Sequence, residues 1–251
     1  MTLAGKRVLI TGGGSGVGAD LARGFALAGA DVVICGRRTG PLRAVAGPLG
    51  ARFVTADVTR ETDIARAFTE AGPCDIVIAN AGAADSAPFG QVTLEQWNAM
   101  LAVNLTGVFL TFRAGLAQLP GWGRLIAVAS TAGLRGYAYV APYAAAKHGV
   151  VGLCRSLASE VAKRPVTVNA LCPGYLDTDM TDRSVANIAA KTGMTVEAAR
   201  GRLAATNPQK RLVQPAEVTA AALWLCGAGS DLINGQAIAI AGVRCERHAT
   251  N

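Results

Sequence analysis

The stretch Thr11-Gly12-Gly13-Gly14-Ser15-Gly16-Val17-Gly18 stands between an apolar run and a segment of helical period. Glycine adopts positive φ and lets the backbone approach a ligand, while the start of a helix directs N–H groups at bound phosphate. A tight strand-to-helix turn without a ligand has the same composition. Its place after a first strand and before a helix nevertheless favours a dinucleotide site. The residues expected to bind are Gly12, Gly14, Ser15, Gly16, Val17 and Gly18.

The rest of the chain repeats this alternation of apolar runs with longer helical segments. The expected strands are 7–11, 31–35, 52–56, 75–79, 124–130, 166–172 and 236–241, and the expected helices lie near 17–28, 40–48, 60–71, 94–118, 142–162 and 215–227. The strands are almost continuously apolar, as burial on both faces requires. The sequence therefore predicts an α/β fold: a doubly wound parallel seven-stranded Rossmann sheet with helices on both faces, in a single domain over 1–251.

Composition limits the classes of protein that this chain can be. It has 251 residues, 51% of them hydrophobic and 16% charged, which fits one globular domain and argues against disorder. No apolar run reaches the ~20 residues of a membrane helix, and the amino terminus does not resemble a signal peptide. Six scattered cysteines without a C-x-x-C pair, and only two histidines, predict a cytoplasmic protein with no metal site.

The net charge of +7 raises the question of nucleic-acid binding. The basic residues are scattered or paired, as in Lys163-Arg164 and Lys210-Arg211, and form no run interleaved with aromatic residues. We therefore expect a small phosphate-bearing ligand rather than a nucleic acid.

The end of the second expected strand indicates which dinucleotide binds. NAD-binding folds usually place an acidic residue there to hold the ribose 2′-hydroxyl, whereas this chain has Cys35-Gly36-Arg37-Arg38. Two guanidinium groups can pair with a 2′-phosphate, so Arg37 and Arg38 favour NADP(H) over NAD(H). The same residues could instead be solvated arginines after a strand.

A second motif carries the chemistry. Tyr143 and Lys147 are four residues apart, which places a phenol and an ammonium on one helical face, and Ser130 precedes them at the end of an expected strand. A nearby cation is expected to lower the pKa of the phenol from ~10 towards neutrality, so that Tyr143 can exchange a proton with an alcohol or carbonyl oxygen. His148 is expected to be a packing or surface residue.

Together these motifs resemble the short-chain dehydrogenase/reductase family over essentially the whole chain. The matching residues are Thr11-Gly12-x-x-x-Gly16-x-Gly18, Asp57, Ala79-Asn80-Ala81-Gly82, Asn104, Ser130, Tyr143-x-x-x-Lys147, Pro173-Gly174 and Thr178. The resemblance implies that Tyr143 is the general acid/base, that Ser130 binds the substrate oxygen, and that Lys147 binds the nicotinamide ribose. It also implies that Asn104 holds a water linked to Lys147. Further cofactor-binding residues implied are Asp57, Val58, Asn80, Ala81, Gly82, Tyr143, Lys147, Pro173, Gly174 and Thr178.

Two positions depart from the family pattern. Ala79 replaces a usual Asn, and Ala241-Gly242-Val243 replaces a frequent Asp-Gly-Gly, which leaves any role for that acidic residue in doubt.

The substrate is less closely defined than the chemistry. The long connection 175–214 is expected to form a substrate lid. The candidate substrate residues are Ser130, Leu134, Tyr137, Tyr143, Tyr175 and Met180. The resemblance favours a 3-oxoacyl or 3-hydroxyacyl substrate. The phosphates of a 3-oxoacyl thioester could be bound by Arg135, Lys191, Arg200 and Arg202. The alternatives are a general ketone, cyclic alcohol or polyol dehydrogenase, and a non-catalytic dinucleotide-sensing module. The resemblance also implies a homotetramer built on helices 94–118 and 142–162.

Overall fold

The computed structural model describes residues 2–119 and 121–242, and seven strands within them form one parallel sheet in the order β3-β2-β1-β4-β5-β6-β7. The strands are β1 (Arg7–Thr11), β2 (Asp31–Gly36), β3 (Arg52–Thr55), β4 (Ile76–Ala79), β5 (Gly123–Val128), β6 (Val166–Pro173) and β7 (Ala237–Ile240). The predicted fold class is therefore confirmed. Because β1 pairs with both β2 and β4, the chain reverses its direction of progress across the sheet at β1, where such folds bind ligands.

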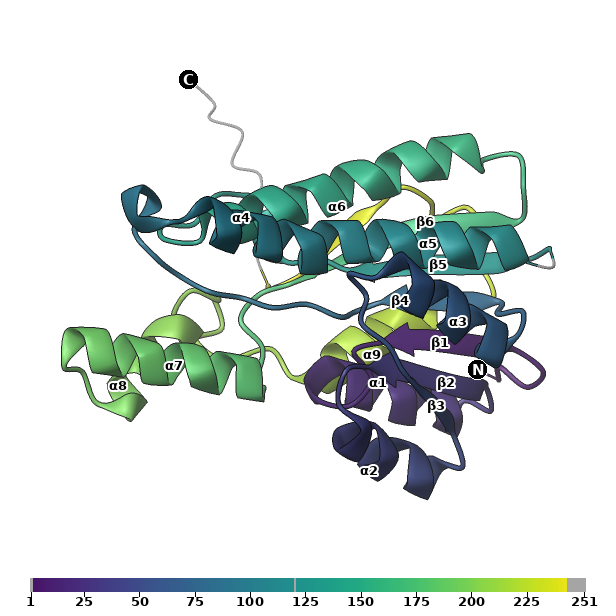
Figure 1. The fold of residues 1–251 in the computed structure, drawn as a ribbon, viewed down its shortest axis with the longest axis horizontal. Helices are drawn as coiled ribbons and strands as arrows, with labels where there is room; N and C mark the ends of the chain where they lie inside the picture. The colour runs from purple at the N-terminus through teal and green to yellow at the C-terminus, as the bar shows by residue number, and fades with distance from the viewer. Residues whose placement is uncertain (1, 120, 243–251) are drawn as a thin grey trace.

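Helices cover both faces of this sheet (Figure 1). They are α1 (Gly16–Leu27), α2 (Thr39–Leu49), α3 (Glu61–Ala71), α4 (Leu94–Leu101), α5 (Gly107–Gln118), α6 (Ala141–Glu160), α7 (Asp179–Thr192), α8 (Val196–Ala204) and α9 (Pro215–Leu225). Phe25 of α1 and Leu42 of α2 belong to the core on one face, and Phe68 of α3 and Phe112 of α5 to the core on the other. Burial on both sides explains the continuous apolar strands.

The expected helix 94–118 is divided. A π-helical turn, η2 (Ala102–Thr106), separates α4 from α5. By length and hydropathy alone, Leu94–Gln118 is the one stretch of the described residues that could cross a membrane. Its α5 part, however, buries Val108, Leu110 and Phe112 in the core of the sheet, which accounts for its apolar character.

The connection 175–214 is more regular than the sequence suggests, because it contains α7 and α8. Both helices lie beyond the carboxyl ends of the strands (Figure 1). They form a small apolar cluster of their own, with Val185, Ala199, Leu203 and Leu212 buried at its centre. The segment is thus a separate helical layer over the edge at which the candidate site lies.

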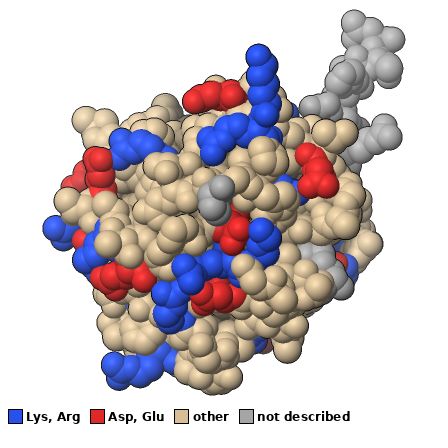
Figure 2. Space-filling view, turned by 90° about the vertical axis from the view of Figure 1, so that its right-hand side faces the viewer, with Lys and Arg blue, Asp and Glu red and all other residues tan. Residues whose placement is uncertain are grey.

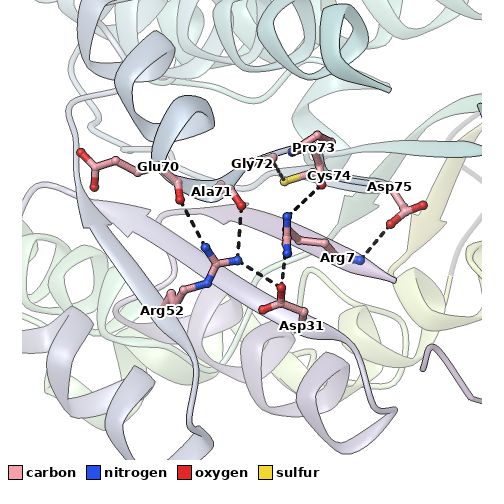
Figure 3. Close-up of polar contacts among 9 residues, drawn as sticks. All are labelled: Arg7, Asp31, Arg52, Glu70, Ala71, Gly72, Pro73, Cys74 and Asp75. Atoms are coloured by element: carbon pink, nitrogen blue, oxygen red, sulfur yellow. Dashed lines mark hydrogen bonds and ion pairs between the residues drawn. The ribbon is translucent and has the colours of Figure 1, made fainter. Parts of the chain in front are cut away.

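The opposite edge of the sheet carries charged residues of both signs. Figure 2 views the molecule from this side, where basic and acidic side chains are intermixed. Asp31 accepts a hydrogen bond from Arg7 Nε at 2.6 Å and another from Arg52 Nη2 at 3.1 Å (Figure 3). Arg52 also donates to the carbonyls of Glu70 and Ala71 at the end of α3. These contacts connect the amino ends of three strands to one helix.

Candidate active site

The glycine turn joins β1 to α1 and has the backbone that its sequence predicts. Gly12 and Gly16 have φ of 68° and 52°. A Cβ at Gly18 would lie 2.2 Å from the Gly12 carbonyl oxygen, and one at Gly13 would lie 2.5 Å from Ile34 Cβ. Ser15 precedes α1 without a side-chain cap hydrogen bond, so the first amides of that helix keep their donors. This uncapped, close-packed turn fits a pyrophosphate.

Asn80 fastens the glycine turn to β4. Its Nδ2 donates to the carbonyls of Thr11 and Gly12 at 2.9 and 3.3 Å. In return, the Thr11 hydroxyl accepts from the backbone amides of Asn80 and Ala81, both at 3.0 Å. Asn80 therefore sets the shape of the turn across two neighbouring strands. Thr11 is not among the residues that the sequence analysis expects at the site. Its position at the end of β1 could have indicated that it supports the turn.

The carboxyl ends of β2 and β3 present Arg37, Arg38 and Asp57. The side chains of Arg37 and Arg38 are exposed and make no hydrogen bond or ion pair with another described residue. Asp57 Oδ1 accepts from the amide and the hydroxyl of Thr59, at 3.0 and 2.8 Å, which fixes its carboxylate at this edge. Val58 is buried, and its side chain packs against Gly107 rather than lying at the surface.

Ser130, Tyr143 and Lys147 come from the ends of β5 and α6. The structure places Ser130 after β5 rather than within it, as the residue that caps the short turn η3 (Thr131–Gly133). The Ser130 hydroxyl accepts from the Ala132 amide at 3.1 Å. Lys147 is buried, its Nζ donates to the Val128 carbonyl at 2.9 Å, and this atom lies 5.6 Å from the ring centroid of Tyr143. The three residues thus lie close together, as the spacing predicts.

The electrostatics of this pair differ from the sequence-based expectation. Burial raises the pKa of Tyr143 to about 12, and a hydrogen bond with Ser130 opposes this effect only in part. Burial also lowers the pKa of Lys147 to about 8. Lys147 is not among the groups that lower the Tyr143 pKa in this structure, so the lowering expected from the neighbouring ammonium is not found among the described residues.

Asn104 lies in the π-helical turn η2 and is fully buried. Its Oδ1 accepts from the Ala83 amide at 3.2 Å, and its Nδ2 donates to the carbonyls of Ala83 and Met100 at 2.9 and 3.1 Å. A Cβ at Gly82 would lie 2.9 Å from Asn104 Oδ1 and 3.8 Å from Lys147 Nζ. Asn104 therefore holds the segment after β4 beside Lys147, and Gly82 leaves the space between them.

The segment that follows β6 brings the connection 175–214 to the glycine turn. Pro173 ends β6, and Gly174 leaves room for Asn207, because a Cβ at position 174 would lie 2.4 Å from Asn207 Oδ1. Thr178 precedes α7, and its Cγ2 lies 3.4 Å from the position of a Cβ at Gly16. Thr178 is thus placed against the cofactor turn. The contact between Asn207 and Gly174 was not predicted, because the two residues are 33 positions apart in the sequence.

The expected substrate residues divide into two groups. Tyr137 and Tyr175 lie near enough to Tyr143 to raise its pKa electrostatically. Met180 is half-buried in the first turn of α7, and Leu134 packs partly against the core. Of the lid charges, Arg200 is paired with Asp177 and Asp182.

Other sequence-based expectations concern residues outside the site. His148 is exposed, and its Nδ1 lies 2.9 Å from the carbonyl of Ala144 in its own helix. Among the described residues there is no group of three or more His, Cys, Asp or Glu side chains that could hold a metal ion. Val243, Cys245 and His248 lie outside the described residues.

Comparison with known proteins finds one family over most of the chain. The family model for short chain dehydrogenase matches residues 6–189. The D-beta-hydroxybutyrate dehydrogenase of Rhizobium meliloti is 34% identical, with 94% of this chain and 97% of the relative covered. The 3-oxoacyl-(acyl-carrier-protein) reductase MabA of Mycobacterium tuberculosis is also 34% identical, with coverage of 94% and 92%. A crystal structure of an actinorhodin polyketide ketoreductase variant with NADPH superposes with a TM-score of 0.88 at 34% identity, covering 94% of this chain and 96% of that one.

Proposed function

The chain belongs to the short-chain dehydrogenase/reductase family, and on that premise we propose that it interconverts a 3-oxoacyl-type ketone and the corresponding 3-hydroxy compound. The family assignment makes it an NAD(P)-dependent oxidoreductase that acts on CH–OH groups. The observation that carries the proposal is the convergence of Ser130, Tyr143 and Lys147 beside the glycine turn. The finer choice of substrate is supported by the relatives, which are reductases or dehydrogenases of 3-oxo and 3-hydroxy compounds by name.

We assign the reactive roles to four residues. The nicotinamide, when bound, gives or takes the hydride. Tyr143 carries the proton: with a pKa of about 12 it keeps its hydrogen at neutral pH and can donate it to a carbonyl oxygen. Ser130 donates a second hydrogen bond to that oxygen as negative charge develops. Lys147 holds the nicotinamide ribose, and Asn104 keeps the backbone beside Lys147 in place.

The cofactor-binding residues follow from the same edge of the sheet. The turn from Gly12 to Gly18 would hold the pyrophosphate, Asp57 and Val58 would contact the adenine, and Asn80, Ala81 and Gly82 would contact the ribose. Pro173, Gly174 and Thr178 would contact the nicotinamide. NADP(H) is the preferred cofactor, because Arg37 and Arg38 are exposed at the end of β2 without a described partner and no carboxylate takes their place.

Turnover of 3-oxo compounds by the Tyr143→Phe variant tests the function. We expect the wild-type protein to oxidise NADPH with acetoacetyl-CoA or free 3-oxo acids, and the variant to lose at least ~100-fold in kcat. Thr69→Val, on the exposed side of α3, is the matched control for loss of a hydroxyl. Normal turnover by Tyr143→Phe would refute the mechanism. Activity on cyclic ketones or sugars alone would establish the alternative, a general ketone or polyol dehydrogenase.

Assembly and location are proposed on separate grounds. A homotetramer, with α4, α5 and α6 at its contacts, is supported by the 42% exposure of Phe109 and the 73% exposure of Leu94 on these helices. Light scattering that shows a monomer would contradict it. A reducing cytoplasm is supported by Cys35, Cys74, Cys154 and Cys226, which are buried thiols.

A further inference from the structure

A polar cluster lies in the connection between η3 and α6. The Tyr137 hydroxyl donates to Thr131 Oγ1 at 2.8 Å, and Arg135 Nε donates to the Tyr137 oxygen at 2.9 Å. The guanidinium carbon of Arg135 also lies 4.7 Å from the Tyr137 ring centroid, and the Arg135 amide donates to the Thr131 carbonyl at 3.1 Å. Both the backbone and the guanidinium plane of Arg135 are therefore held in place.

This cluster is close to the reacting atoms. The Tyr137 hydroxyl is bonded to Thr131, which directly follows Ser130 in the chain. Arg135 contacts Tyr137 directly and follows Ser130 by only five positions. The guanidinium is thus joined through one hydroxyl to the neighbour of Ser130, and Tyr137 also acts to raise the pKa of Tyr143.

Arg135 is a half-buried cation without a described counter-charge. Its Nε is used by Tyr137, whereas no described residue accepts from its two terminal nitrogens. Two other arginines of this region do have acidic partners, because Arg200 pairs with Asp177 and Asp182, and Arg211 pairs with Glu217. A fixed guanidinium with both terminal nitrogens available is suited to a carboxylate, which it can bind through two parallel hydrogen bonds.

Resting on the function proposed above, we propose that Arg135 binds the carboxylate of a free 3-oxo or 3-hydroxy acid. In such an acid one methylene separates the ketone from the carboxylate, so an anion next to Tyr137 is compatible with a ketone oxygen at Ser130 and Tyr143. In a carrier thioester the phosphates lie many bonds away from the ketone. Thr131 and Tyr137 are positioning residues for the guanidinium, and the site selects acids over neutral ketones.

The test compares acetoacetate with its neutral methyl ester and with acetoacetyl-CoA, in the wild-type protein and the Arg135→Gln and Arg135→Lys variants. We expect Arg135→Gln to lower kcat/KM for acetoacetate by about 10- to 100-fold, mainly through KM, while kcat/KM for the ester changes less than about 3-fold. Arg135→Lys should recover part of the loss, because it keeps the charge without the paired geometry. The matched control is Arg23→Gln, on the exposed side of α1.

Several outcomes would overturn the proposal. An equal loss for acid and ester would make Arg135 a general structural residue, and no loss for the acid would remove its role. A loss confined to the thioester would place the bound anion in the carrier phosphates. If the wild-type protein turns over none of the three compounds, the proposed function fails. Calorimetric measurement of 3-hydroxybutyrate binding in the presence of NADPH then tests the anion site by itself. If the wild-type protein binds 3-hydroxybutyrate and Arg135→Gln abolishes this binding, the anion site is supported. If the variant binds as well as the wild type, or if the wild-type protein does not bind, the anion site is refuted.

Discussion

Single buried charges determine the chemistry of this site. Lys147 is only 3% exposed, and its one hydrogen-bond partner among the described residues is the Val128 carbonyl. With a pKa of about 8, the ammonium is easily neutralised compared with an ordinary lysine. The protonation state of Lys147 is therefore sensitive to charged groups placed near it.

At the same scale, Arg37 and Arg38 should decide cofactor preference. We expect the double variant Arg37→Ser, Arg38→Ser to raise KM for NADPH by about 10- to 100-fold and to leave KM for NADH almost unchanged, because only the 2′-phosphate loses its partners. Arg43→Ser, one turn further along α2 and also exposed, is the control. Steady-state kinetics with both cofactors provide the measurement. A wild-type KM for NADH equal to or below that for NADPH would exclude the NADP(H) assignment.

The spacing of residues in the sequence was sufficient to find candidate site residues whose partners lie on the same turn or the same helix. Gly12 to Gly18 and the pair Tyr143 and Lys147 are of this kind, since each motif lies on one turn or one helix. Asn207 is different, because its place beside Gly174 is set by tertiary packing. The phenol pKa could not be predicted either, since it depends on how completely the fold removes water from Tyr143.

Among the elements, helix 94–118 shows the limits of periodicity. Its apolar pattern is continuous, so the sequence gives no sign of the π-helical turn at η2. That turn contains Asn104, whose side chain bonds with the backbone of Ala83 beyond β4. Single π-turns inside helices are frequently found at functional sites. The interruption is thus explained by a long-range contact that local propensity does not encode.

The helices α7 and α8, which are expected to form the lid, are linked by Arg200. Arg200 of α8 pairs with Asp177, just before Thr178, and with Asp182 of α7 at 2.6 Å. Asp177 also accepts from Gln214 Nε2 at 3.3 Å, and its amide donates to the Val213 carbonyl. Arg200 therefore links α8 to the first turn of α7 and to the segment just before Thr178.

We expect Arg200→Gln to raise the substrate KM by about 3- to 10-fold with a smaller change in kcat, because a loosened lid weakens binding more than proton transfer. The paired side chains are partly exposed, so their attraction is screened by salt. The wild-type KM should consequently rise more between low and high ionic strength than the KM of the variant. Arg202→Gln, exposed on the same helix, is the control. A kcat loss that exceeds the KM change would contradict this account.

At the scale of the whole molecule, the two edges of the sheet carry different kinds of residues. The carboxyl ends carry the glycine turn, Asp57, Asn80 and Ser130, whereas the amino ends carry the ion pairs of Figure 3. The sequence predicts the doubly wound parallel sheet because its strands are almost continuously apolar and alternate with helical segments. It does not predict the ion pairs, since residues 7, 31 and 52 meet only when three parallel strands are in register.

This separation leads to a prediction about stability without function. Asp31→Asn should lower the free energy of unfolding by about 1 kcal/mol, because Arg7 and Arg52 lose a partly exposed partner. KM and kcat should remain unchanged, since the candidate site lies at the other edge of the sheet. Glu160→Gln, at the exposed end of α6, is the control, and a change in KM would show that the two edges are coupled.

The pH dependence of the same variant tests the cause. Burial acts to raise the pKa of Asp31, but hydrogen bonding to Arg7 and the charges of Arg52 and Arg7 outweigh it and lower the pKa. A carboxyl with a lowered folded pKa stabilises the fold above its unfolded value of ~3.9, and this contribution disappears as the pH falls through the folded value. Urea unfolding at pH 7, 5, 4 and 3 should therefore show a constant difference between wild type and Asp31→Asn down to about pH 4, which then shrinks. A difference that persists undiminished at pH 3 would mean that packing, rather than the carboxylate charge, connects the strands.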